Sequence, residues 1–573
     1  MNKFLIFASI LGAAGAGAYL IQTTTPETAA NQQSVAAYAP DDTVFYSGTV
    51  EPFDLRQGFG WMQGVDMSAQ VEAMEAMINT SNNQPPALNV LGQLYVDYLK
   101  HASNFETLTK TFGIGDKLNA ASYTVGAVPV LRYQADDPKA VETLVLNIEK
   151  RIGYSAAPKT IDNITYRGYP FGEGDAAGAD YELIIGHHGD HVVFTINTPL
   201  ADETDLHPAL GAVKPSRSLA QTGTLNDIID EYGFNASYVG LIDHTAIIQG
   251  LTSPEANNFG QSVKQLLALN NAGEVLSAFQ SEGCRKDLTA LAQGWPRTVS
   301  GYTELNDKKM VMVTTVESNL TQTMTALQKL RGAIPASYRQ QPAMFAMALG
   351  LNLDELPAFL NKAWADFVGQ QYQCPLLVDA QNQLKQNNPA MLSMATAMVQ
   401  SVKGVAVALL DMQFAEGPSG PMPDPQKTSV ALTITADNPQ SLLMMAATFV
   451  PELGGLQLED NGKPQTLAIP GSPVPINIAM QGQQLTLFTG AGADAYLPKN
   501  AQSAANVEQG FLYFGIDYSK YFGLMEQALK MAPLAAQEHD IKTLESLKGL
   551  AMNVAMTTDF SDKGIVFEVI GQK

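Results

Sequence analysis

The chain has little charge and few cysteines for its length. Of 573 residues, 16% are charged and two are cysteines, and 56 acidic residues against 34 basic ones leave a net charge of −22. Sequence-independent nucleic-acid binding needs Lys and Arg to replace phosphate counterions, so this balance excludes nucleic acid as a partner. It also disfavours docking on anionic lipid. Two cysteines without a CxxC pattern exclude a common redox motif and, by themselves, a zinc site.

The chain also lacks the short motifs of common active sites. It contains no GxSxG, Ser-x-x-Lys, HExxH or GxxxxGK[ST] pattern. The glycine-rich 490–492 follows an expected strand, but Pro498 comes too soon for the long helix of a dinucleotide site. A catalytic triad can still assemble in space, and His244 beside Asp243 is one candidate, although Asp243 is interpreted as a helix cap. The sequence therefore predicts no cofactor and no identified catalytic residue.

What the chain does contain is enough apolar material for several cores. Hydrophobic residues make up 46% of the sequence, which is ordinary for a folded protein and too high for a disordered one. With about 150 residues per domain as a guide, two to four domains are expected.

The amino terminus has the pattern of an export segment. An uncharged run of 18 residues, 4–21, follows Lys3 and passes from apolar to small residues. This is typical of a bacterial signal peptide, and its length is also at the lower limit for a membrane anchor. Residues 1–22 are predicted to be one or the other, and 23–39 a flexible linker. The predicted location is the periplasm, with the protein soluble or tethered to the inner membrane by 4–21.

Export would permit a disulfide between Cys284 and Cys374. The loop-entropy relation gives such a bond roughly 4–5 kcal/mol of stabilisation for a loop of about 90 residues. The alternative is two separate buried thiols.

Similar features recur at one offset. Asp137-Pro138 and Asn438-Pro439 each stand between an expected strand and an expected helix, and they lie 301 positions apart. Nearly the same offset relates Gly48 to Gly350. We interpret this as an internally duplicated α+β fold of antiparallel sheets with helical layers, in two similar halves, 40–333 and 342–573.

We interpret each half as two copies of a smaller unit. It opens with a strand that carries a glycine, interpreted as structural, in the segments 46–48, 238–240, 348–350 and 513–515. Asp243, Asp354 and Asp517 follow as expected helix caps. A pair of long strands ends each unit, at 122–135, 298–318, 403–436 and 550–570. The Pro/Gly-rich 417–423 is expected to be an exposed loop.

The densest group of potential metal ligands is a histidine cluster. Imidazole and carboxylate groups together suit zinc or a similar ion, and the residues concerned are His187, His188, Asp190 and His191, with Asp202, Glu203, Asp205 and His207 downstream. The alternative is a solvated hairpin turn, because Gly189-Asp190 suits one. The matching turn at 481–483 has no such ligands, so the fold does not require them.

Methionine is abundant, with 22 residues clustered on expected helices. Met391, Met394 and Met398 share one expected helical face, and Met444 and Met445 lie on another helix. Flexible thioether side chains adapt to apolar ligands of varied shape. The alternative is ordinary core filling.

Pro40-Asp41-Asp42-Thr43, followed by the strand VFYSG, resembles the start of several uncharacterised exported bacterial envelope proteins. In these, a Pro-x-Asp-Thr lead enters an aromatic strand. The resemblance implies an envelope location and carries no functional residues.

These observations favour a non-catalytic periplasmic binding, chaperone or scaffold protein. Its expected partner is an apolar ligand or another envelope protein. The alternative is an envelope hydrolase with a site built from residues of both halves.

Overall fold

The computed structural model describes residues 34–62, 65–80, 84–172, 181–198, 203–269, 272–389, 401–417, 420–467, 472–498, 507–531 and 552–573, with 396, 399, 469, 541, 544 and 547 between them. The chain divides into two compact units. Unit 1 comprises Met1–Glu317 and Gln373–Pro375, and unit 2 comprises Ser318–Tyr372 and Leu376–Lys573. The predicted signal segment 1–22 lies outside the described residues.

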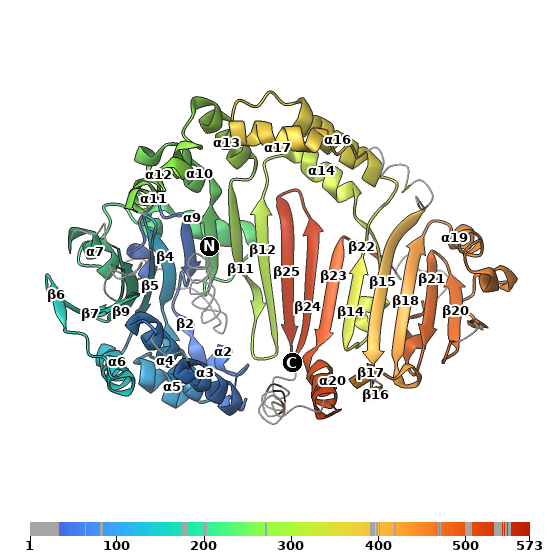
Figure 1. The fold of residues 1–573 in the computed structure, drawn as a ribbon, viewed down its shortest axis with the longest axis horizontal. Helices are drawn as coiled ribbons and strands as arrows, with labels where there is room; N and C mark the ends of the chain where they lie inside the picture. The colour runs from blue at the N-terminus through green and yellow to red at the C-terminus, as the bar shows by residue number, and fades with distance from the viewer. Residues whose placement is uncertain are drawn as a thin grey trace. The chain divides into compact units, whose positions relative to one another are not determined.

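Unit 1 is built on an antiparallel sheet (Figure 1). Its strands follow the order β12-β11-β10-β1-β4-β5-β9-β8-β7-β6. Their bounds are β1 (Phe45–Gly48), β4 (Ala120–Val125), β5 (Val128–Gln134), β6 (Lys159–Ile161), β7 (Ile164–Pro170), β8 (Glu182–His188), β9 (His191–Asn197), β10 (Val239–Asp243), β11 (Arg297–Leu305) and β12 (Lys309–Glu317). A short pair, β2 (Phe53–Asp54) and β3 (Lys117–Leu118), stands apart from this sheet.

Helices cover both faces of the outer part of this sheet. One core forms between Tyr46, Tyr123 and Val130 of the strands and η1 (Val35–Ala37), α7 (Glu203–Leu210), α8 (Leu219–Thr222) and α9 (Thr224–Tyr232). A second core lies on the other face, under α4 (Pro86–His101) and α6 (Pro138–Ile152). The remaining helices are α2 (Leu55–Phe59), α3 (Ser68–Thr80), α5 (Phe105–Phe112), α10 (His244–Thr252), η2 (Pro254–Ala256), α11 (Asn258–Leu269), α12 (Gly273–Ser277) and α13 (Glu282–Gly294).

The strands of unit 2 are also antiparallel and pair in the order β25-β24-β23-β14-β15-β18-β21-β20-β19. Its strands are β14 (Phe345–Leu349), β15 (Val402–Asp411), β18 (Ser429–Ala436), β19 (Gln465–Leu467), β20 (Ile476–Gln481), β21 (Gln484–Thr489), β23 (Leu512–Asp517), β24 (Asn553–Phe560) and β25 (Gly564–Gln572). One face is covered by α15 (Ser337–Gln340), η6 (Ala493–Tyr496) and β13 (Gly332–Pro335), which pairs with β22 (Val507–Gly510). The other helices are α14 (Thr321–Lys329), α16 (Leu356–Gly369), α17 (Pro375–Lys385), η4 (Pro425–Lys427), α19 (Pro439–Ala446), η5 (Pro451–Gly455) and α20 (Tyr518–Met531).

The mixed helix and sheet content confirms the predicted α+β class. The two units also share a connection order. If the nine strands of unit 2 are numbered 1 to 9 along the chain, they pair in the order 9-8-7-1-2-3-6-5-4. The strands of unit 1, numbered in the same way without the edge strand β6, pair in the same order. The helix after the third strand begins alike in both, because Asp137 caps α6 and Asn438 caps α19, as predicted.

Several predicted local features differ from the structure. The last residues of the predicted linker 23–39 are part of unit 1, because the apolar η1 is buried in its core. The segment 417–423 is not a plain loop, since β16 (Phe414–Gly417) and β17 (Gly420–Pro423) form a hairpin. The compact units divide after Glu317, whereas the predicted halves end at 333 and restart at 342, because β13 pairs within unit 2.

Two of the predicted strand glycines, Gly240 and Gly515, do not occupy equivalent positions. Gly240 pairs with Ser47 and Ser300, whereas Gly515 pairs with Ala346 and Ala555 on the covered face of unit 2. A side-chain carbon at Gly240 would collide with the Ser300 hydroxyl, which explains that glycine by close approach.

Candidate functional site

Unit 2 presents an apolar sheet face. Directly paired residues of an antiparallel sheet point to the same side. The central row across seven strands therefore lies on one face, and it contains Leu487, Leu432, Val407, Met347, Phe514, Met556 and Val569. We call this side the open face.

Two further rows extend the open face on either side. One contains Leu485, Ile434, Val405, Leu349, Leu512, Thr558 and Phe567, and the other contains Thr489, Val430, Leu409, Phe345, Ile516, Val554 and Gly571. Thr489, Thr558 and Gly571 are the exceptions among these 21 positions, and the rest carry large apolar side chains. No position in the three rows is charged.

The opposite side of β14, β15 and β18 is lined by small residues. Its two central rows contain Thr486, Thr433, Ala406, Ala348 and Tyr513, and Phe488, Ala431, Ala408, Ala346 and Gly515. These residues pack under Ile334, Tyr338 and Tyr496 of the covering layer. In β14, β15 and β18 the larger apolar side chains are therefore on the side that this layer does not cover.

Four residues of the open face are substantially exposed. Met347, Val405 and Met556 each have 42% of their surface accessible, and Phe567 has 41%. A sheet with one solvated face ordinarily carries polar residues on it. With strands about 4.8 Å apart and rows about 7 Å apart, the three rows have an outline of roughly 29 by 14 Å, or about 400 Å², within which Leu485 and Val554 are buried. Exposed apolar patches often mark binding sites.

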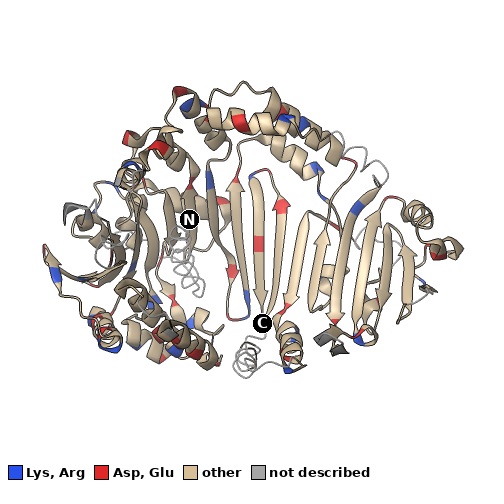
Figure 2. Cartoon of the chain, in the orientation of Figure 1, with Lys and Arg blue, Asp and Glu red and all other residues tan. Residues whose placement is uncertain are grey.

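The charged residues of these strands lie at their ends, apart from Glu568 in the middle of β25, which points to the side opposite the open face. Figure 2 shows β14, β18 and β21 without acidic or basic residues. The one cation within the seven strands is Lys403, whose ammonium group contacts the carboxylates of Asp354 and Asp437. Asp354 is thus an ion-pair partner and not the predicted helix cap, and α16 begins after Glu355 without a side-chain cap. At one end, α19 packs over the open face through Leu443 and Leu485.

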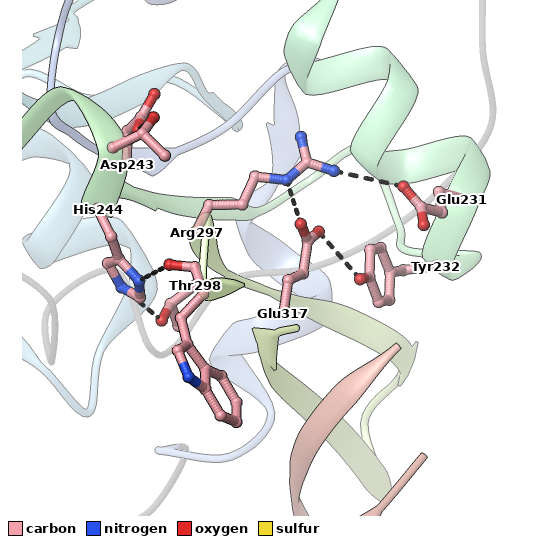
Figure 3. A network of polar contacts seen from close by, with 9 residues as sticks. Glu231, Tyr232, Asp243, His244, Arg297, Thr298 and Glu317 are labelled. Atoms are coloured by element: carbon pink, nitrogen blue, oxygen red, sulfur yellow. Dashed lines mark hydrogen bonds and ion pairs between the residues drawn. The ribbon is translucent and has the colours of Figure 1, made fainter. Parts of the chain in front are cut away.

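Unit 1 contains the network of polar contacts drawn in Figure 3. The Arg297 guanidinium binds the carboxylate of Glu317, with Nε to Oε2 at 2.7 Å, and that of Glu231 at 3.3 Å. Tyr232 donates its hydroxyl to Glu317 at 3.0 Å. Burial, and then the Glu317 carboxylate, raise the pKa of Tyr232 above its usual range. The phenol therefore stays protonated and the network holds β11 and β12 against α9.

His244 in the same region has a defined tautomer. The Trp295 carbonyl oxygen lies 2.8 Å from Nδ1 and can only accept, so Nδ1 carries the proton. Nε2 is then free to accept the Thr298 hydroxyl at 3.1 Å. Asp243 accepts from the backbone N–H of Ala246 and is the predicted helix cap, not a partner of the imidazole. The arrangement is a His–Thr pair positioned by a carbonyl.

The predicted metal ligands lie on the hairpin of β8 and β9. Neighbours along a strand point to opposite faces, so His187 and His188 diverge, whereas His188 pairs directly with His191. His187 lines a shallow depression with Val141 and Arg167. Among the described side chains no group of three metal-binding residues converges. Of the downstream candidates, Asp202 and the side chains of Glu203 and Asp205 lie outside the description, and His207 pairs with Asp162 at 3.2 Å. The metal site stays a prediction.

His191 is 5% exposed and packs beside Arg132. Its Nδ1 contacts the Asp190 carboxylate at 2.8 Å, and its ring lies 5.0 Å from the Tyr38 ring. The Arg132 guanidinium lies over the Tyr38 ring, with its Cζ atom 4.0 Å from the ring centroid. Burial lowers the pKa of His191 to about 4, against the opposing pull of Asp190. A second positive charge is therefore excluded from this core at neutral pH.

The two cysteines lie at disulfide-bonding distance, as predicted. Cys284 is on α13, and Cys374 belongs to the short segment of unit 1 that interrupts unit 2 in the sequence. The Asp287 carboxylate accepts the backbone N–H groups of Gln373 and Cys374 at 2.6 and 2.8 Å. Two kinds of bond thus hold this segment in unit 1.

The methionines named from the sequence are not those of the open face. Met391, Met394 and Met398 lie outside the described residues. Met444 is on α19 and is 61% exposed. Met347 and Met556 lie on strands, where the signal in the sequence is the alternation of large and small residues.

No described helix has the length and apolar character that a membrane crossing requires. No known protein family, curated protein or solved structure matches the chain.

Proposed function

We propose that this protein is a non-catalytic binding protein that holds an apolar ligand on the open face of unit 2. The observation that carries the proposal is the row Val407, Met347, Phe514 and Met556, which is apolar and partly exposed. Placing an apolar partner on this surface gains about 25 cal/mol per Å² removed from water. Met347 and Met556 add adaptability to shape.

The test uses Nile red, an uncharged apolar dye, with the purified full chain. The expected result is a saturable rise in fluorescence that Met347→Gln combined with Met556→Gln weakens at least fivefold. Met444→Gln is the matched control, because it changes an exposed methionine of the same unit outside the three rows. Equal dye binding by both variants would contradict the proposal.

We also propose that the two units arose by internal duplication and that the protein works in the bacterial periplasm, soluble or tethered by 4–21. The shared strand order and the matching caps of α6 and α19 support the first statement. The export-like residues 1–22 support the second. An experimental structure with another strand order in either unit would contradict the duplication, and retention of a reporter fusion in the cytoplasm would contradict export.

A second candidate function is an envelope hydrolase, favoured by the His244–Thr298 pair. An imidazole whose Nε2 accepts a hydroxyl proton can act as general base for that hydroxyl. The test is p-nitrophenyl acetate hydrolysis by the wild type and by Thr298→Ala and Thr298→Ser. A hydrolase would lose the rate with alanine and recover part of it with serine, and equal rates in all three would exclude this role.

A further inference from the structure

We propose that the occupant of the open face is the acyl chain of a lipid with an uncharged or zwitterionic headgroup. This inference rests on the proposed binding function and specifies the class of its ligand. Three properties of the face carry it: its lack of hydrogen-bonding groups, its lack of charge and its area.

The open face offers almost no hydrogen-bonding partners to a peptide backbone. Its side chains consist of carbon and sulfur apart from the hydroxyls of Thr489 and Thr558, and the strand N–H and C=O groups beneath them are paired in the ladders. An extended peptide laid on this surface would bury its own N–H and C=O groups without partners, which is unfavourable. A hydrocarbon chain has no such groups.

The charges near the face do not suit an anionic headgroup. Lys403 is the one cation of the seven strands, and it already contacts Asp354 and Asp437. The whole chain has a net charge of −22, which repels anions further. A neutral or zwitterionic headgroup meets neither obstacle.

The area of the face suits a single chain better than a second copy of the protein. A standard interface buries about 800 Å² on each partner, twice the roughly 400 Å² of the three rows. A membrane acyl chain reaches about 15 Å, half of the ~30 Å hydrocarbon core. It therefore fits along the ~29 Å row, in contact with Met347, Phe514 and Met556.

The experiment measures binding of lysophosphatidylcholines with 8, 10 and 12 acyl carbons to the full chain by calorimetry, below their micelle concentrations. Each methylene placed on the face should tighten binding two- to fourfold, because a fully buried methylene contributes about fourfold. Lysophosphatidylglycerol of equal chain length should bind more weakly. Met347→Gln with Met556→Gln should weaken binding at least tenfold, and Met444→Gln should leave it unchanged.

The outcomes separate the inference from the function on which it rests. Dye binding that needs Met347 and Met556, together with lipid affinities that do not depend on chain length, overturns the acyl inference and leaves the binding function. The same holds if a Leu-rich helical peptide binds more tightly than the 12-carbon lipid, or if the double variant abolishes a dimer seen by light scattering. Failure of both dye and lipid to bind overturns both. Circular dichroism melting curves verify that each variant is folded.

Discussion

The two units arrange corresponding strands alike but treat one face differently. In unit 2 the central strands place Val407, Met347, Phe514, Met556 and Val569 in a row. In unit 1 the strands at the same places in the order carry small and hydroxyl-bearing residues, in the row Ser122, Ser47, Gly240, Ser300 and Thr314.

Unit 1 covers this row with its own aromatic side chains. The Tyr238 hydroxyl lies 3.1 Å from the Ser47 hydroxyl, and its ring packs 5.5 Å from the ring of Tyr302, which is 1% exposed. Small residues leave room for these rings, whereas the large side chains of unit 2 themselves reach solvent. The same strand order can therefore give a face filled by its own side chains or an exposed apolar face, depending on one side-chain row.

The largest expected effect concerns the disulfide, since both cysteines belong to unit 1. Cys374→Ser should lower the free energy of unfolding of unit 1 by about 4 kcal/mol and leave unit 2 unchanged. Trp61 and Trp295 report on unit 1 in a Trp364→Phe background, because Trp364 is the one tryptophan of unit 2. Two titratable thiols in the denatured, non-reduced wild type would refute the bond.

The comparison can also be tested in unit 1, by removing an aromatic side chain that covers its row of small residues. Tyr302→Ala leaves a cavity in a fully packed position and should cost about 3–4 kcal/mol in unit 1. Tyr521→Ala, on an exposed tyrosine of α20, is the control and should cost under 1 kcal/mol. Urea unfolding followed by tryptophan fluorescence measures both, and equal losses would contradict the assigned role of Tyr302.

Acid should destabilise unit 1 through His191. Its pKa is about 4 when folded and about 6.5 when unfolded, so the unfolded state binds more protons between these values. Stability is fully present above pH 6.5 and falls as the pH drops toward 4, by up to about 3 kcal/mol. His191→Gln should flatten this part of the unfolding profile. Unit 2 has one histidine, His539, so its profile supplies the contrast.

The smallest expected change in stability comes from substitutions on the two faces of one strand. Ala406 is buried on the covered face of β15, and its neighbour Val405 is exposed on the open face. Ala406→Leu should overpack unit 2 and cost about 1–3 kcal/mol, whereas Val405→Leu should change its stability by less than 0.5 kcal/mol. Hydrogen exchange of β15 and β14 amides measures the difference. Similar protection loss in both variants would show that the two faces are packed alike.

Much of the fold was predictable because its signals are local. Asp137-Pro138 and Asn438-Pro439 mark helix starts through their own side chains and rings, and the long strand pairs were predicted from alternation and turns. The covered part of the linker was missed because Val35 and Ala36 gain their burial from distant strands.

The candidate site was less predictable because it depends on which face is covered. The β14 sequence FAMAL alternates Phe345, Met347 and Leu349 with two alanines, and this pattern favours placing the large side chains inside. The structure does the reverse, since β13 and α15, which directly precede β14, and the distant η6 cover the alanines. The adjacency of His187 and His188 in sequence does not bring their side chains together, because adjacent strand residues face apart.

Because the chain returns to unit 1 at Gln373–Pro375, unit 1 is completed only after part of unit 2 has been synthesised. Translation proceeds from the amino terminus, so Cys284 is made 90 residues before the cysteine with which it pairs. Until then the newly made unit 1 holds an open thiol, and Asp287 lacks the two N–H groups that it will accept. A truncated protein that stops after Glu317 keeps that incomplete state permanently, so a fragment of unit 1 needs residues from beyond its apparent end to reach its mature form.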